Sequence, residues 1–110
     1  MTKPEKLVRD KIPEIIISRG EEVFWRTAEE GEYLSSLEDK LHEEVDEFLK
    51  NPSGEEAADI LEVLHAICAL KGVDLTNLED IRQKKAAERG GFKNRITLEE
   101  ARKKGVFPTE

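Results

Sequence analysis

A four-residue break, Asn-Pro-Ser-Gly at residues 51–54, interrupts a long stretch of helical pattern and limits the folds open to this sequence. Proline disrupts a helix that runs through it, and Ser53 with Glu56 matches the capping-box pattern that begins a new one. On both sides of the break, apolar residues recur every three or four positions, as on the buried face of a helix. The sequence therefore predicts two antiparallel helices, over residues 30–50 and 54–71.

One further helix is expected on each side of this pair. The first covers residues 6–20, where Asp10 can act as its cap. The last runs from Thr76, which with Glu79 matches a second capping box, to Arg89. Glycine ends both segments, and it is the residue found most often just past a helix C-terminus.

The remaining segments are expected to contain little helix. Residues 22–28 form a short extended or irregular piece, and residues 92–97 form a short strand or an extended loop. Thr97 with Glu100 could open a last helical turn before Gly105.

The length of 110 residues fits one domain, and the sequence contains no internal repeat, low-complexity segment or linker. Hydrophobic residues make up 37% of the chain and aromatic residues 5%, so the core must be mostly aliphatic. Together with the helical pattern, this composition predicts a single all-α domain over residues 1–110.

The sequence also argues against several classes of protein. Cys68 is the single cysteine, which rules out an internal disulfide framework or a cysteine-based zinc site and fits the reducing cytoplasm. The N-terminus has no apolar stretch resembling a signal peptide. Charged residues interrupt the longest apolar region, residues 57–70, so no membrane span is expected. A net charge of −7 argues against a nucleic-acid polymer as partner.

The charge is unevenly distributed along the chain. Residues 29–62 contain thirteen acidic residues and two lysines, whereas residues 82–104 contain nine basic and three acidic residues. An acidic middle and a basic C-terminal third would suit a metal ion on one side and an anion on the other. The alternative is that both segments are solvated helix faces.

Four of the acidic residues lie on or beside the apolar faces of the two central helices. At about 100° per residue, Glu44 and Glu47 fall on one edge of the first face. Glu56 falls inside the apolar stripe of the second helix, with Asp59 beside it. An unpaired carboxylate there is costly, and few basic residues lie on these helices to neutralise it. Four carboxylates on adjacent helices suit Mg²⁺ or Mn²⁺.

Two alternatives apply to the same helices. Glu56 could serve only the capping box with Ser53. Glu62 and His65 match the Glu-x-x-His spacing of carboxylate-bridged di-iron bundles, but the helical wheel places both away from the apolar face. The carboxylate site is therefore the preferred interpretation.

The pattern Glu43-Glu44-x-x-Glu47 followed by Glu56-x-x-Asp59 resembles the all-α nucleotide pyrophosphohydrolases, the superfamily that contains MazG, dimeric dUTPases and phosphoribosyl-ATP pyrophosphohydrolase. Three further stretches are similar to its phosphoribosyl-ATP-pyrophosphohydrolase-like branch, namely residues 6–16, 56–63 and 88–92. The resemblance extends over nearly the whole chain, from about residue 6 to residue 98.

The resemblance implies a MazG-like four-helix core of antiparallel helices that is completed by oligomerisation, as a dimer or a tetramer. It implies that Mg²⁺, or Mn²⁺ in its place, is held by Glu44, Glu47, Glu56 and Asp59, and that the neighbouring Glu43 helps to activate water. The implied reaction cleaves noncanonical or surplus nucleoside triphosphates between the α and β phosphates, which yields a nucleoside monophosphate and pyrophosphate.

A triphosphate substrate also requires cations from the protein. Lys85, Arg89 and Lys93 surround the Gly-Gly pair after the last helix and are the first candidates, followed by Arg9 and Lys11 near the N-terminus. The Gly-Gly pair itself is more simply a helix C-cap than a phosphate cradle. Two aromatic side chains are expected in the core or in a dimer contact rather than stacked on a base: Phe24 and Trp25.

Two other functions are alternatives. One is phosphoribosyl-ATP hydrolysis in histidine synthesis, to which the branch resemblance points. The other is a non-catalytic helical interaction module whose acidic cluster is vestigial or binds a basic partner. A homo-oligomer is expected in each case, because two amphipathic helices in so short a chain bury more apolar surface by pairing across a two-fold axis than alone.

Overall fold

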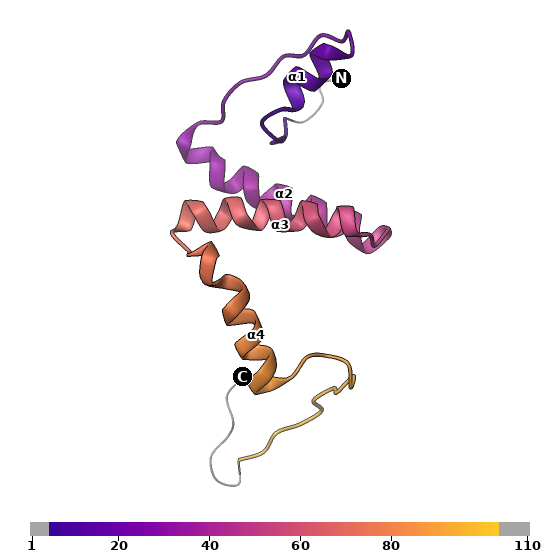
Figure 1. Cartoon of the computed structure of the whole chain (residues 1–110), viewed down its shortest axis with the longest axis vertical. Coiled ribbons are helices and arrows are strands. Elements are labelled where there is room, and N and C mark those ends of the chain that lie inside the picture. The colour runs from indigo at the N-terminus through magenta and orange to yellow at the C-terminus, as the bar shows by residue number, and fades with distance from the viewer. Residues whose placement is uncertain (1–4, 104–110) are drawn as a thin grey trace. The chain divides into compact units, whose positions relative to one another are not determined.

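A computed structural model describes residues 5–103, and every regular element in that range is a helix (Figure 1). The elements in chain order are α1 (Ile12–Ser18), α2 (Glu30–Lys50), α3 (Gly54–Lys71), the short 3₁₀ helix η1 (Leu75–Asn77) and α4 (Leu78–Arg89). The expected all-α class is confirmed. None of the described helices combines the length and the apolar character that a membrane span requires.

The internal contacts divide the chain into two units, and the boundary between them in the sequence falls between Leu75 and Thr76. The first unit holds α1, α2 and α3, and the second holds α4 and the segment that follows it. The expectation of a single domain over residues 1–110 stays a prediction.

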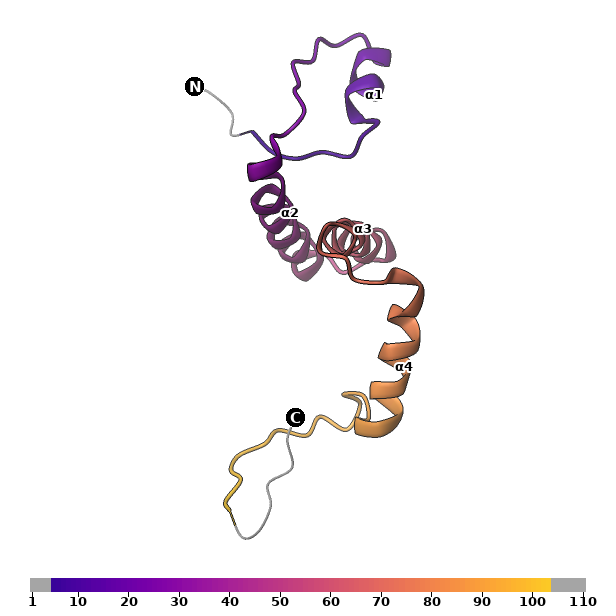
Figure 2. The same ribbon diagram turned by 90° about the vertical axis from the view of Figure 1, so that its left-hand side faces the viewer.

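The first unit is built on a hairpin of α2 and α3, which lie side by side in both Figure 1 and Figure 2. Only residues 51–53 connect them, and Ser53 begins α3 by accepting a hydrogen bond at its Oγ from the backbone N–H of Glu56 (3.1 Å). Gly72 ends α3 with φ of 73°, a left-handed conformation that glycine adopts without strain. Both helices have the predicted bounds.

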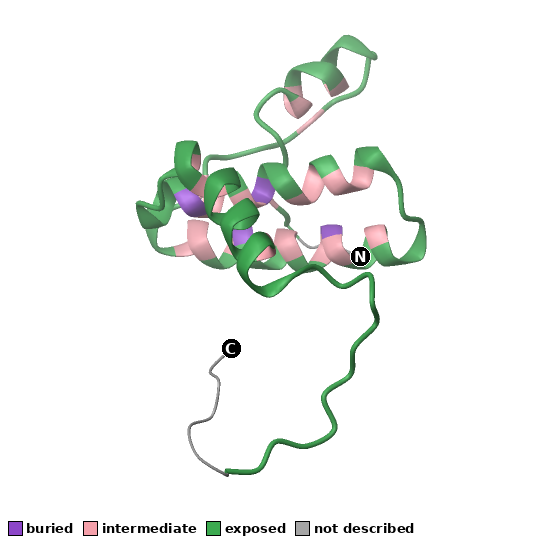
Figure 3. Cartoon of the chain, turned by 60° about the horizontal axis from the view of Figure 1, so that its bottom comes forward, coloured by how far each residue is buried: buried purple, intermediate pink, exposed green. Residues whose placement is uncertain are grey.

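The apolar core of the described chain is small. Three apolar side chains are buried, namely Leu37 on α2 and Val63 and Cys68 on α3. Figure 3, in which buried residues are purple, shows how few residues are buried. Phe24 and Trp25 are 92% and 65% exposed. The predicted core role of these two aromatic residues is therefore wrong within one chain, and the dimer contact stays a prediction.

The first helix is shorter than predicted. α1 begins at Ile12, its N-cap is Lys11 rather than Asp10, and Pro13 lies in its first turn. The pyrrolidine ring of a proline clashes with the preceding turn of a helix, so residues 6–11 cannot extend α1 towards the N-terminus. The result is an irregular N-terminal segment whose side chains reach the hairpin.

The C-terminal predictions also need correction. The N-cap of α4 is Asn77, because Thr76 lies within η1. The Glu79 carboxylate accepts hydrogen bonds from Arg82. Residues 92–97 form a loop, which was one of the two predicted alternatives. The turn expected from Thr97 is absent through residue 103, and Gly105 lies outside the described residues.

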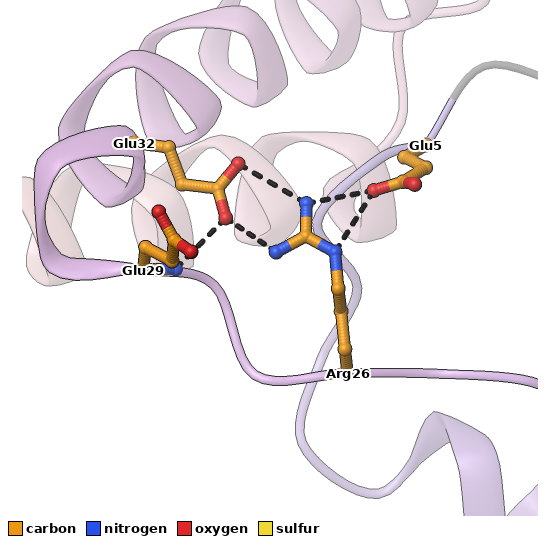
Figure 4. A network of polar contacts seen from close by, with 4 residues as sticks. All are labelled: Glu5, Arg26, Glu29 and Glu32. Carbon is orange, nitrogen blue, oxygen red and sulfur yellow. Dashed lines mark hydrogen bonds and ion pairs between the residues drawn. The ribbon is translucent and has the colours of Figure 1, made fainter.

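Arg26 ties the N-terminal segment to the start of α2 (Figure 4). Its guanidinium donates to Glu5 Oε2 from Nε (3.1 Å) and from Nη2 (2.7 Å), and it also forms an ion pair with Glu32. Glu32 in turn accepts from the backbone N–H of Glu29 (2.8 Å) and completes a capping box. These hydrogen bonds lower the pKa of Glu32 to about 2, with the Arg26 contact as the main cause.

We expect Arg26→Gln to lower the thermal midpoint at neutral pH, and this loss to shrink in acid. A carboxyl group whose pKa is lowered on folding stabilises the fold fully above its ordinary pKa near 4.5, and this contribution is lost as the pH falls toward 2. Thermal unfolding of wild type and Arg26→Gln, followed by circular dichroism at pH 7, 4.5 and 3, measures the difference in thermal midpoint at each pH. Arg19→Gln is the control, because the Arg19 side chain is exposed and makes no ion pair among the described residues. An equal loss at pH 7 and pH 3 would contradict the assignment.

Candidate metal centre

Three carboxylates from the hairpin converge on one point. Glu44 comes from α2, and Glu56 and Asp59 lie one turn apart on α3. One oxygen from each lies within 4.8 Å of the others. These three residues, called the carboxylate cluster below, are three of the four predicted metal ligands.

Glu44 is the buried member of the carboxylate cluster, with 9% of its surface exposed. Lys40 lies one helical turn earlier on α2, and its Nζ is 3.2 Å from Glu44 Oε1. The same ammonium group is 3.5 Å from Glu43 Oε1. Few basic residues were expected to neutralise these carboxylates, and Lys40 is one that neutralises Glu44. The i,i+4 spacing of Lys40 and Glu44 was the signal for this pair.

Glu56 is half-buried, and its carboxylate makes no hydrogen bond or ion pair with any described residue. Its backbone N–H makes the capping bond to Ser53, which leaves the side chain free for the carboxylate cluster. Partial desolvation raises the pKa of Glu56, and the negative charges of Asp59, Glu44, Glu47 and Glu55 raise it further. Capping and cluster membership are thus compatible roles of one residue.

We expect Glu56→Gln to raise the thermal midpoint of the metal-free protein at neutral pH. A carboxyl group whose pKa is raised on folding destabilises the fold once it ionises, so the cost appears as the pH rises above its ordinary pKa near 4.5. Glutamine keeps the shape without the charge. Thermal unfolding in EDTA at pH 4 and pH 7.5 should show a gain only at pH 7.5, with the exposed Glu38→Gln as control. A loss of stability at pH 7.5 would contradict this account.

Two residues of the N-terminal segment also reach the acidic side chains. Arg9 Nη2 lies 2.7 Å from Asp59 Oδ1, and Lys6 Nζ lies 3.1 Å from Glu43 Oε1. Arg9 was predicted to bind substrate phosphate, and the structure places it on a carboxylate. Lys6 was missed, since a contact across 37 residues leaves no periodic signal in the sequence.

Glu43 and Glu47 lie beside the carboxylate cluster rather than within it. Glu43 is half-buried, and its hydrogen bond from Lys6, with the charge of Lys40, lowers its pKa. Glu47 is exposed and contributes no oxygen within the 4.8 Å group, although its charge helps to raise the pKa of Glu56. Its role as a fourth ligand stays a prediction.

The other predicted substrate-binding cations are exposed. Lys11 precedes α1, whereas Lys85, Arg89 and Lys93 belong to the second unit. Arg89 and Lys93 line a hollow together with the glycines between them. Gly90 is the C-cap of α4, and its N–H donates to the Ala86 carbonyl oxygen (2.8 Å), so the simpler interpretation of the Gly-Gly pair is confirmed.

The donor set of the carboxylate cluster fits a hard divalent cation. Mg²⁺ takes oxygen ligands at about 2.1 Å in an octahedron, so oxygens on opposite sides of the ion lie about 4.2 Å apart. The three oxygens of the carboxylate cluster lie within 4.8 Å of one another, so side-chain rotation is needed to bring all three onto one ion. The di-iron alternative has no comparable support. Glu62 and His65 are both exposed, and neither belongs to a group of converging metal ligands among the described residues.

Comparison of the chain with models of protein families, with curated proteins and with solved structures found no match. The function proposed below therefore depends on the carboxylate cluster, on the charges around it and on the sequence motifs.

Proposed function

We propose that this protein is an Mg²⁺-dependent nucleotide pyrophosphohydrolase that cleaves nucleoside triphosphates between the α and β phosphates. The observation that carries the proposal is the convergence of Glu44, Glu56 and Asp59 within 4.8 Å, where Glu56 makes no ion pair with any described residue. The resemblance of the sequence motifs to the all-α nucleotide pyrophosphohydrolases supports the same activity. In this proposal Mn²⁺ substitutes for Mg²⁺.

The chemistry of the phosphoanhydride explains why such a site suits this reaction. The negative oxygens of a triphosphate repel an attacking water, so catalysis depends on charge neutralisation and alignment. A divalent ion supplies both and lowers the pKa of bound water. Glu43 lies next to Glu44 in the chain, and its carboxylate is the proposed acceptor of the proton that the attacking water releases.

We also propose that the hairpin of α2 and α3 pairs with a second copy to complete a MazG-like four-helix core. The small core of the single chain supports this, as do exposed apolar side chains on the hairpin, which include Leu49 (69%) and Leu61 (53%). Pairing would cover surface of this kind. Sedimentation equilibrium should give a mass of at least twice 12.5 kDa, and a monomer at micromolar concentration would contradict it.

Pyrophosphate release with Mg²⁺ or Mn²⁺ across a panel of canonical and modified (deoxy)nucleoside triphosphates tests the activity. The panel should include phosphoribosyl-ATP, and Glu44→Ala should be measured beside the wild type. We expect release from at least one nucleoside triphosphate and its loss in the variant. Release from phosphoribosyl-ATP alone would assign the histidine-synthesis reaction. A folded protein that is silent across the panel and gains no thermal stability from either metal would be the interaction module.

A further inference from the structure

We propose that Arg9 is an internal counter-cation of the carboxylate cluster, and that a divalent metal ion must displace it from Asp59 in order to bind. This inference rests on the proposed function, because it concerns the same site. It assigns the irregular N-terminal segment the role of a latch that opens when metal binds.

The contact itself is short and reaches across the chain. Arg9 Nη2 donates to Asp59 Oδ1 over 2.7 Å, although the two residues are 50 positions apart. The side chains are 54% and 37% exposed, so water screens the pair. Exposed ion pairs contribute little net free energy, which makes this one easy to exchange for a stronger ligand.

The three carboxylates differ in how firmly their cations are held. Lys40 neutralises Glu44 from the preceding turn of the same helix, and only 18% of its side chain is exposed. Arg9 comes instead from the irregular segment before α1, outside the hairpin helices, and 54% of its side chain is exposed. Arg9 is therefore the cation that can leave the carboxylate cluster at low cost.

The charge balance favours the exchange. Three carboxylates face two cations, Lys40 and Arg9, so one negative charge is uncompensated. Replacement of Arg9 by a divalent ion would bring the carboxylate cluster to neutrality. A released guanidinium would then be free beside the site to pair with a phosphate oxygen, which is the role the sequence predicted for Arg9.

Lys6 provides a matched control from the same segment. Its ammonium group pairs with Glu43, which lies outside the carboxylate cluster, at 3.1 Å. Lys6→Gln and Arg9→Gln each remove one positive charge from the N-terminal segment, so they share any effect of net charge on metal binding. They differ in whether a cation is removed from a metal ligand.

Titration of Mn²⁺ into the full chain, followed by calorimetry and by electron paramagnetic resonance, tests the latch. We expect Arg9→Gln to bind Mn²⁺ about two- to fivefold more tightly than wild type, because the ion no longer has to break an exposed ion pair. Lys6→Gln should change the affinity by much less than Arg9→Gln does. Arg9→Lys, which restores the charge, should return the affinity towards that of wild type. Circular dichroism checks that each variant is folded.

Hydrogen exchange supplies an independent readout. The amide of Ile12, which donates to the Arg9 carbonyl oxygen (3.0 Å), should exchange faster in wild type when Mn²⁺ is bound, and in Arg9→Gln it should exchange fast without the ion. Equal or weaker Mn²⁺ binding by Arg9→Gln, with wild type still binding, would overturn the latch and leave the metal site intact. Failure of wild type and of all the variants to bind Mn²⁺ would instead overturn the proposed function.

Discussion

Asp59→Asn is expected to weaken Mn²⁺ binding by at least about a hundredfold. Changes to residues that only support metal ligands cost 10- to 100-fold in affinity, so loss of a direct carboxylate ligand should reach or exceed the upper end. The substitution keeps the shape of the side chain and removes its charge. Calorimetric titration of the metal-free protein measures the affinity directly.

The matched control for this variant is Asp46→Asn. Asp46 is an exposed acid on α2 that contributes no oxygen to the carboxylate cluster, and its substitution changes the net charge equally. Thermal stabilisation by saturating Mn²⁺ should persist in Asp46→Asn and disappear in Asp59→Asn, because a ligand that binds only the folded state stabilises it by mass action. Equal affinities of the two variants would show that the metal binds elsewhere.

Leu37→Ala is expected to destabilise the protein by about 2–4 kcal/mol, the cost of removing a buried leucine side chain and leaving a cavity. Leu37 is 3% exposed and is one of three buried apolar side chains in residues 5–103. Few other contacts can compensate, so this is a large share of the free energy of unfolding of a small domain.

Leu98→Ala makes the same chemical change in the segment after α4, where the side chain is 79% exposed. Urea unfolding of both variants at matched concentration should show a clearly larger loss for Leu37→Ala, with an unchanged dependence on denaturant. A loss no larger than that of Leu98→Ala would mean that the α2–α3 contact is not the core of the fold.

The hairpin was predictable because its signals are local. The apolar spacing, the Pro-Ser-Gly break and the Ser53 cap each act within a few residues, and together they give the observed bounds of α2 and α3. The same spacing brought Glu44, Glu56 and Asp59 to one side of the hairpin. The helical wheel placed Glu56 deeper than it lies, because α2 covers only part of the α3 surface in one chain.

The cations around the carboxylate cluster were harder to predict, because their positions depend on tertiary structure. Lys6 and Arg9 approach it only because Pro13 prevents α1 from extending towards the N-terminus, so residues 6–11 are not helical and can run beside the hairpin. Helical periodicity carries no information on such a segment. The predicted start of α4 at Thr76 was wrong for a related reason. Residues 75–77 form the 3₁₀ helix η1, so α4 begins at Leu78 with Asn77 as its N-cap.

Analysis of the products of one reaction tests the proposed function most directly. Wild-type protein and Asp59→Asn are each incubated with Mg²⁺ and a nucleoside triphosphate from which the wild type releases pyrophosphate. The phosphorus-containing products are then separated and quantified. We expect nucleoside monophosphate and pyrophosphate in equal amounts from wild type, loss of both in EDTA, and none above background from Asp59→Asn. Nucleoside diphosphate with inorganic phosphate, or equal turnover by the two proteins, would contradict it.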